Sequence, residues 1–286
     1  MGVHTSVAGG LWKSVDAALH LGCDAMQIFA RNPRSWADTP LSPETVSLFR
    51  ERRDAAGLWP VAVHTTYLIN LCAPDDDIYA KSLRLFQSEL RSAEALGADY
   101  LVTHLGSPKE MGNPFAIERV KASLKAVAES GLGRITEILL ENTSGAGSGF
   151  GADLDDIAEL LDAASLFGLK AGLCADTCHG FAAGYRISDS RGSDGFVSSI
   201  ESSVGLKRLK LIHLNDSKGK LGSKLDRHEH IGRGEIGAGG IRSFLMDERI
   251  AGLPLILETP KKTPEDDPEN LRVVRLMAGM GGGKKT

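Results

Sequence analysis

Eight short apolar segments recur along the chain, and longer stretches whose apolar residues stand three and four apart lie between them. The short segments predict buried strands, and the longer spacing predicts helices packed on them. Eight such units are typical of an α/β protein with a (β/α)8 barrel, the TIM barrel, although a doubly wound sheet gives a similar alternation. The predicted strands are GVHTS (2–6), AMQIFA (25–30), WPVAVH (59–64), DYLVTH (99–104), EILLEN (137–142), AGLCAD (171–176), LKLIHL (209–214) and LPLILE (253–258).

The chain shows no linker rich in proline, glycine or serine, so we expect one domain. Its 286 residues are a common length for a single α/β barrel. We predict a catalytic barrel over residues 1–262 and a C-terminal extension over residues 263–286. The glycine- and lysine-rich tail GMGGGKKT (279–286) is expected to be disordered. The clearest helical patterns cover residues 77–97 and 116–131.

The composition excludes several classes of protein. Hydrophobic residues make up 42% of the chain and charged residues 24%, as in globular proteins rather than disordered or fibrous ones. No basic segment followed by an apolar one opens the chain, and no apolar run of about 18 residues occurs, so we expect a cytoplasmic protein without a membrane span. The four cysteines are too few for a disulfide framework and are expected to be reduced and buried.

Residues that commonly bind metals stand at the ends of the predicted strands. In a barrel these ends converge on one face, where active sites lie, so side chains far apart in sequence point to a common centre. One histidine after an apolar strand is commonly structural, but six consecutive strands with such an end predict a site. These residues, at or near the strand ends, are His64, His104, Glu141, Asp176, His213 and Glu258, and His4 lies near the end of the first predicted strand.

Two further pieces add to this constellation. His179 lies three residues after Asp176, within one helical turn, and Asp226 and His228 project to the same side of an extended loop. The set then holds five histidines and four carboxylates, whereas one catalytic zinc needs three protein ligands and a water. More than one metal ion is therefore predicted. Mixed imidazole and carboxylate ligands suit zinc or manganese better than magnesium.

Several metal ions side by side suit a reaction with an anionic transition state, and hydrolysis of a phosphate ester is the leading case. The motifs of a serine hydrolase, a phosphate loop or a dinucleotide fold are absent from the sequence. The glycine-rich segment 141–151 lacks the lysine of a phosphate loop, so we interpret it as a flexible barrel loop. The net charge of −4 argues weakly against nucleic acid, but this sum omits bound metal ions.

The same motifs, in this order, resemble the endonuclease IV family of apurinic/apyrimidinic (AP) endonucleases. DTCHGFAAGY, and HLNDSK followed by DRHEHIG, are the most specific of them. The matching segments cover residues 2–260 almost without a gap: GVHTSVAGG, FARNPRSW (29–36), VHTTYLINL (63–71), THLGS (103–107), LLENTSGAGSGFG (139–151), CADTCHGFAAGY (174–185), HLNDSKGKLGSKLDRHEHIGRGEIG (213–237) and PLILETP (254–260). Leu105 departs from the proline found in some relatives.

The resemblance implies a xylose-isomerase-like TIM barrel with three zinc ions. It would cleave double-stranded DNA on the 5′ side of an abasic site, leaving a 3′-hydroxyl, and would also clear blocked 3′ ends by phosphodiesterase or phosphatase activity. Glu141 and Glu258 would help to orient the attacking water. Carried over by motif, the ligands of the first zinc would be His64, His104 and Glu141, those of the second Glu141, Asp176, His213 and Glu258, and those of the third His179, Asp226 and His228.

The resemblance also implies residues that probe the DNA at the lesion. Arg34 in NPRSW, and Tyr67 with Leu68 in TTYLINL, would enter the duplex while the abasic sugar is flipped out. The alternatives are a solvated arginine and ordinary loop packing. Lys218, Lys220 and Lys224 are expected either to contact phosphates or to form a solvated basic loop. Trp36 could stack on a base, but we expect it to be buried on the barrel rim.

Two other functions stay open at this point. A metal-dependent sugar isomerase or epimerase also carries His, Asp and Glu at its strand ends, but it would not require His179 with the Asp226 and His228 pair. A zinc-stabilised binding module is disfavoured because structural zinc sites favour cysteine. His230 and Asp216 are set aside as ligands because strand ends and motif both pass them by. A monomer is expected, since one barrel with DNA in its upper groove needs no second subunit.

Overall fold

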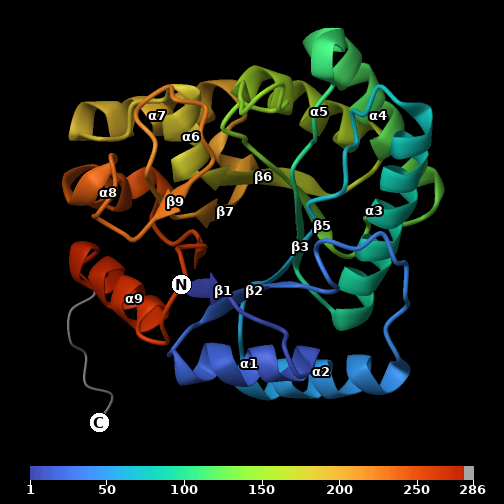
Figure 1. Ribbon diagram of the computed structural model, residues 1–286, viewed down its shortest axis with the longest axis horizontal. Coiled ribbons are helices and arrows are strands. Elements are labelled where there is room, and N and C mark those ends of the chain that lie inside the picture. The colour runs from blue at the N-terminus through green and yellow to red at the C-terminus, as the bar shows by residue number, and fades with distance from the viewer. Residues whose placement is uncertain (280–286) are drawn as a thin grey trace.

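Eight parallel strands close into a barrel in a computed structural model of the chain, which describes residues 1–279 (Figure 1). The first strand pairs with both the second and the last, which confirms the barrel and excludes an open doubly wound sheet. All eight predicted strands are present. They are β1 (Gly2–His4), β2 (Ala25–Phe29), β3 (Val61–His64), β4 (Tyr100–Thr103), β5 (Glu137–Glu141), β6 (Ala171–Asp176), β7 (Leu209–His213) and β10 (Leu255–Leu257).

Helices surround the strands as an outer ring (Figure 1). The predicted helix 77–97 is α3, which Asp75 caps by accepting a hydrogen bond from the backbone N of Ile78. The predicted helix 116–131 corresponds to α4, which begins four residues earlier than expected. The helices are α1 (Leu11–His20), α2 (Pro43–Ala56), α3 (Asp76–Leu96), α4 (Gly112–Glu129), α5 (Leu154–Leu166), α6 (Thr177–Ala183), α7 (Ser190–Ser203), α8 (Gly237–Leu245) and α9 (Asp266–Met277), with 3-10 turns η1 (Lys109–Met111), η2 (Leu206–Arg208) and η3 (Glu248–Ile250).

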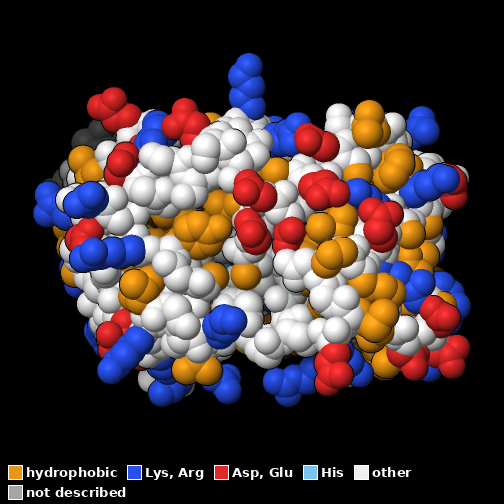
Figure 2. All heavy atoms as spheres, turned by 90° about the horizontal axis from the view of Figure 1, so that it is seen from above, with side chains coloured by type: hydrophobic (Ala, Val, Ile, Leu, Met, Phe, Trp, Pro, Cys, Tyr) orange, Lys and Arg blue, Asp and Glu red, His pale blue; other side chains and the backbone are white. Residues whose placement is uncertain are grey.

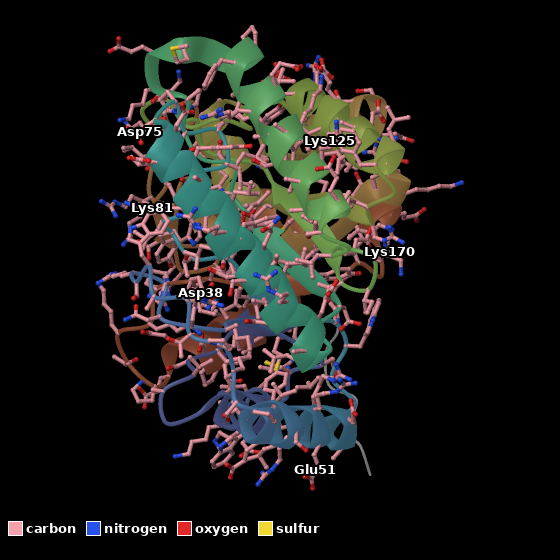
Figure 3. The ribbon with its side chains drawn as sticks, turned by 90° about the vertical axis from the view of Figure 1, so that its right-hand side faces the viewer. Asp38, Glu51, Asp75, Lys81, Lys125 and Lys170 are labelled. Atoms are coloured by element: carbon pink, nitrogen blue, oxygen red, sulfur yellow. The ribbon has the colours of Figure 1, made fainter. Side chains whose placement is uncertain are left out.

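Charged side chains on the ring point away from the barrel, as amphipathic helices require. Figure 3 shows Lys81 on α3 and Lys125 on α4 on this outer surface. The four cysteines lie inside, where they are free and buried as expected. Burial raises the pKa of the Cys72 thiol to about 12. None of the helices within residues 1–279 is both long and apolar enough to cross a membrane.

The segment after residue 262 contains α9, which packs on the barrel beside α8 (Figure 1). Leu271 and Val274 are fully buried in the main hydrophobic core. The Asn270 side chain accepts a hydrogen bond from the backbone N of Ile231, at 2.9 Å, which ties α9 to the loop before α8. Disorder was predicted for the glycine- and lysine-rich tail 279–286. All of it except Gly279 lies outside the described part of the chain.

Candidate metal centre

The metal-type side chains point into the barrel because side chains alternate along a strand. A layer of buried side chains fills the barrel interior, and the strand-end residues lie two positions beyond its members. On β3, Ala62 belongs to this layer and His64 follows it, while on β5 Leu139 is followed by Glu141. The same spacing relates Val102 to His104, Cys174 to Asp176, Leu211 to His213 and Ile256 to Glu258. The next layer is therefore a ring of imidazoles and carboxylates.

Glu141 lies at the centre of this ring and is fully buried. Its Oε2 lies 3.1 Å from His64 Nε2 and 3.0 Å from His104 Nε2, and its Oε1 lies 3.0 Å from His213 Nδ1. Burial alone would raise the pKa of the Glu141 carboxyl, but the charges of His104 and His213 and a hydrogen bond from His179 hold it well below its usual range. The centre thus keeps a buried anion among imidazole nitrogens.

All nine predicted ligands come together, from seven different segments of the chain, in groups whose ligand atoms lie within 4.8 Å of one another. Glu141 belongs to two of these groups, so it can bridge two ions. A further grouping consists of Asp176, Cys178 and His228, of which only Cys178 was not expected from the sequence. The three predicted groups are His64, His104 and Glu141; Glu141, Asp176, His213 and Glu258; and His179, Asp226 and His228.

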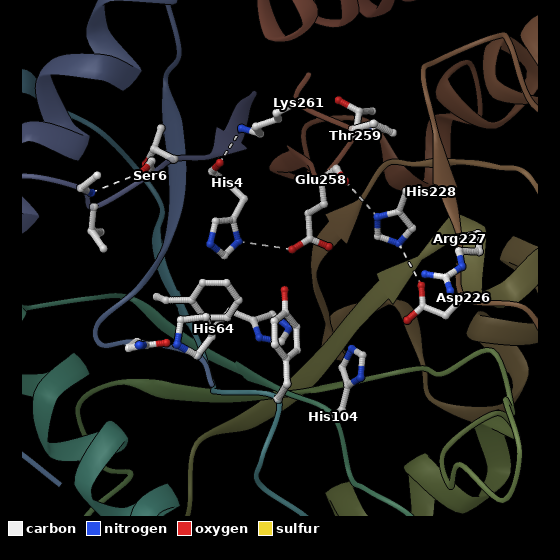
Figure 4. Close-up of a pocket in the computed structure, with 18 of the residues that line it drawn as sticks. His4, Ser6, His64, His104, Asp226, Arg227, His228, Glu258, Thr259 and Lys261 are labelled. Atoms are coloured by element: carbon white, nitrogen blue, oxygen red, sulfur yellow. Dashed lines mark hydrogen bonds and ion pairs between the residues drawn. The ribbon is translucent and has the colours of Figure 1, made fainter. Parts of the chain in front are cut away.

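The third group is assembled by a short helix and a loop. Asp176 caps α6, where its Oδ1 accepts a hydrogen bond from the backbone N of His179 at 2.7 Å. His179 Nε2 lies 3.1 Å from Asp226 Oδ1. His228 Nε2 lies 3.5 Å from the same oxygen, and Figure 4 shows these two side chains facing each other. Burial raises the pKa of Asp226, but the hydrogen bond and charge of His179 and the charge of His228 lower it to about 2.

Three of the histidines hydrogen-bond backbone carbonyls through the ring nitrogen Nδ1, which fixes the orientation of their rings. Nδ1 of His64, His179 and His228 lies 2.8, 3.0 and 3.0 Å from the carbonyl oxygens of Thr65, Asn142 and Glu258. An Nδ1–H that donates in this way leaves Nε2 free to bind a metal. In His228 this Nε2 is buried and has no hydrogen-bond partner in the described structure. A donor set of this kind fits zinc.

Gln27 and His4 also belong to the centre, although neither was predicted as a ligand or partner. Gln27 is fully buried at an inward position of β2, and its Oε1 lies 2.8 Å from His213 Nε2. The ring of His213 is therefore turned the opposite way to that of His64: its Nδ1, not its Nε2, faces Glu141. Gln27 Nε2 lies 2.7 Å from Glu258 Oε1 and 3.0 Å from His4 Nδ1. The sequence signal was an amide two residues after Ala25, at the same spacing as the ligands.

A pocket with a volume of about 880 Å³ opens above the centre (Figure 4). His104, Asp226, His228 and Glu258 line it, whereas Glu141 lies beneath its surface. A pocket of this size with convergent polar groups is the usual form of an active site. Six of the nine groups thus line a pocket that a substrate can enter, and the other three lie buried beneath it.

Comparison with known proteins decides the family. A family model described as a xylose isomerase-like TIM barrel matches residues 15–277. "Probable endonuclease 4" of Methanoculleus marisnigri is 42% identical over 279 residues, which cover 98% of this chain and 99% of that protein. The chain belongs to the endonuclease IV family. The sequence resemblance is thereby confirmed.

Solved structures agree with the assignment to the endonuclease IV family. Endonuclease IV from Thermus thermophilus has a TM-score of 0.87 at 39% identity, with 98% of each chain covered. A D-tagatose 3-epimerase-like protein has a TM-score of 0.72 at 18% identity, also with 98% of each chain covered. That second likeness shows the fold alone.

The residues expected to probe DNA in an endonuclease IV lie on two loops beside the pocket. Arg34, on the loop between β2 and α2, is exposed. Tyr67, after β3, lines the pocket and is 65% exposed, with its ring 5.2 Å from that of Phe29. Leu68 is partly buried and is not among the pocket-lining residues. The expectation that Trp36 is buried is wrong, because it is 42% exposed.

The three lysines of the long loop after β7 do not converge. Lys218 lines the main pocket, and its Nζ lies 3.7 Å from Glu229 Oε2. Lys224 lines a separate pocket of about 560 Å³ beside the glycine-rich loop, and Lys220 is exposed. Acidic side chains gather on an outer face of the molecule instead (Figure 2), on the side where α5 lies in Figure 1. The main pocket itself is lined by four basic and two acidic side chains, so the net charge of −4 does not arise from its lining.

Proposed function

We propose that this member of the endonuclease IV family, a hydrolase that cleaves DNA at AP sites, uses three zinc ions to hydrolyse the phosphodiester on the 5′ side of the abasic sugar, leaving a 3′-hydroxyl. The observation that carries the proposal is the convergence of nine imidazole and carboxylate residues at one pocket. A single catalytic zinc needs only three protein ligands, so this number supports several ions.

The distances between their ligand atoms divide the nine residues into three groups, one for each proposed ion. When bound, zinc supplies positive charge that stabilises an anionic phosphoryl group and makes water more acidic. In the proposed centre, His64, His104 and Glu141 would hold one ion, Glu141, Asp176, His213 and Glu258 would hold a second, and His179, Asp226 and His228 would hold a third.

Glu258 lines the pocket and belongs to the group that shares Glu141, so we assign it the orientation of the attacking water and the acceptance of its proton. Gln27 holds its Oε1, and the side chain of Asn215 accepts a hydrogen bond from its backbone N at 2.8 Å. Because both the carboxylate and the backbone of Glu258 are held, no further conformational entropy is lost in orienting it when substrate binds. Glu141, which is buried below the surface of the pocket, would help to orient the same water.

The exposed loop residues supply recognition of the lesion. An abasic nucleotide has no base to unstack, so flipping it out of the duplex costs little. Tyr67 and Leu68 would fill the space left in the stack, and Arg34 would enter from the neighbouring loop. Lys218 would contact a phosphate, which adds affinity without reading sequence. Blocked 3′ ends would bind in the same way, since they present a phosphate linkage with no base beyond it. One barrel provides the whole site, so we propose a monomer.

An incision assay tests the proposal. The full-length protein is incubated with a labelled duplex that carries one abasic analogue, and the same duplex without the lesion is the control. We expect one cut, immediately 5′ to the lesion, that disappears on chelation and returns with zinc. Extension of the product by a DNA polymerase would confirm the 3′-hydroxyl. An uncut lesion duplex in the presence of zinc would contradict the proposal.

A further inference from the structure

Helix α3 carries polar side chains on a face that is buried. Ser88, Glu89 and Ser92 are 6%, 0% and 7% exposed, and we call these three residues the α3 notch. Buried polar groups cost stability unless they find partners, so their partners indicate what they do. None of them is a predicted metal ligand. Their partners lie on the two loops that carry Arg34 and Tyr67.

The loop after β2 is anchored to the notch through Arg31. Its Nη2 donates to Ser88 Oγ at 3.0 Å and to Ser92 Oγ at 3.2 Å. Its Nη1 donates to Asp38 Oδ1 and to the carbonyl of Ala37, both at 3.3 Å. Ser88 Oγ also donates to Asp38, which lies beside α3 in Figure 3. Both ends of the 31–38 segment are thus tied to one helix, with Arg34 between them.

The loop after β3 is anchored through Glu89. Its Oε1 accepts a hydrogen bond from the backbone N of Thr66 at 3.1 Å, one residue before Tyr67. The backbone N of Tyr67 in turn donates to the carbonyl of Pro33 at 3.2 Å, which joins the two loops. Arg31, Pro33 and Tyr67 all line the main pocket. The notch therefore fixes two walls of the pocket relative to each other.

We propose that the α3 notch and Arg31 are positioning residues that hold the two loops in the arrangement that recognises an abasic site. This inference rests on the proposed function. Loops that are already ordered pay less conformational entropy when DNA binds, so ordering contributes to affinity. Within the described residues, the notch makes no hydrogen bond to a residue of the metal centre. Its loss should weaken recognition of the lesion without slowing hydrolysis.

The first experiment removes the two hydroxyl acceptors. Alanine is a good helix former, so Ser88→Ala with Ser92→Ala should leave α3 folded. We expect KM for the abasic duplex to rise about tenfold, as expected for two lost hydrogen bonds, with kcat within about twofold of the wild type. The control is Ser193→Ala, which removes a buried helical hydroxyl that donates to the carbonyls of Ile187 and Gly240, away from the pocket. A KM equal to that of the control would overturn the proposal.

A second pair of variants tests Glu89. Glu89→Met keeps the length of the side chain but removes the acceptor for the Thr66 backbone, whereas Glu89→Gln keeps a carbonyl oxygen there. We expect Glu89→Met to raise KM and Glu89→Gln to restore most of the loss. A general packing role would instead affect both variants equally in thermal melts and leave the ratio of KM to kcat unchanged.

Digestion with trypsin gives a readout that does not depend on activity. The protease cuts after Arg34 only when the 31–38 segment loosens enough to enter its active site. We expect the double serine variant to be cut there faster than the wild type and the Ser193→Ala control. Unchanged cleavage at Arg34 would overturn the positioning role even if the wild type failed to incise abasic DNA, so the two proposals fail separately.

Discussion

At the scale of single residues, Glu141 is the group on which the centre depends. It is fully buried and contacts histidines from four segments of the chain. Glu141→Gln keeps its shape but removes the negative charge that two ions would share. We expect zinc per chain to fall and incision to slow by more than about 100-fold, since loss of even an outer partner of a metal ligand costs 10–100-fold.

The control for this variant is Glu137→Gln, at the opposite end of β5, where the carboxylate lies 3.6 Å from Lys210 Nζ. It should keep both zinc and activity. Wild-type incision by Glu141→Gln would remove Glu141 from the proposed centre.

His228 and His230 allow a second test within a single loop. Their side chains are 18% and 17% exposed, so burial does not distinguish them. His228 Nε2 is directed at Asp226, whereas His230 Nδ1 lies 3.0 Å from Asn270 Nδ2 on α9. We expect His228→Ala to lose zinc and to slow incision by more than about tenfold. His230→Ala should retain full zinc content. Equal zinc content in the two variants would contradict the assignment.

Six of the nine candidate ligands were predictable because they repeat a simple pattern, a metal-type residue two positions after an inward apolar one. Gln27 follows the same pattern, but an amide is not a usual metal ligand and its role depends on His213 and Glu258, which are distant in sequence. Trp36 shows what such patterns miss, since it was expected to be buried and is 42% exposed. Exposure of a loop residue depends on how the loop packs, which no local pattern records.

At the scale of elements, the long loop after β7 is organised by Asp216. This fully buried carboxylate accepts hydrogen bonds from the backbone N of Ser217, Gly232, Gly234, Ile236 and Gly237. A two-residue ladder between β8 (Asp216–Ser217) and β9 (His228–Glu229) then carries His228 to the pocket. Gly234 is required here, since a Cβ would lie 2.5 Å from Asp216 Oδ1. Asp216, which was set aside as a ligand, thus helps to position His228, a candidate ligand.

Asp216→Ala tests this role. It leaves several buried N–H groups without an acceptor, so we expect a loss of about 3 kcal/mol in the free energy of unfolding and weaker binding of the zinc that His228 would hold. Chemical denaturation and zinc analysis measure the two effects. The control is Asp189→Ala, whose carboxylate accepts one backbone N–H at the start of α7. An effect no larger than that of the control would contradict the organising role.

The two short strands of this loop, β8 and β9, could not be predicted from the sequence. The barrel strands repeat a pattern of apolar residues, but β8 and β9 have two residues each and pair across a loop with no alternation. The helices were easier because 21 residues of α3 repeat the same spacing. The polar residues of the α3 notch look like the solvated side of a helix until the loops that cover them are known.

At the scale of the whole molecule, barrel closure brings together residues from seven segments. The eight strand-helix units gave the fold class but left the doubly wound sheet open, because pairing of the first strand with the last is not a local property. Closure also explains how a chain with a net charge of −4 can bind DNA. The metal ions proposed at the pocket would supply positive charge, while acidic side chains lie on the outer helices.

The number of zinc ions per chain tests the account most directly. Elemental analysis of the full-length protein, after exhaustive dialysis against metal-free buffer, counts every tightly bound ion without assuming a substrate. Three groups of ligands sharing Glu141 predict about three zinc ions per chain. A single ion per chain, or manganese in place of zinc, would contradict the proposed centre and favour the sugar epimerase chemistry that the same fold supports elsewhere.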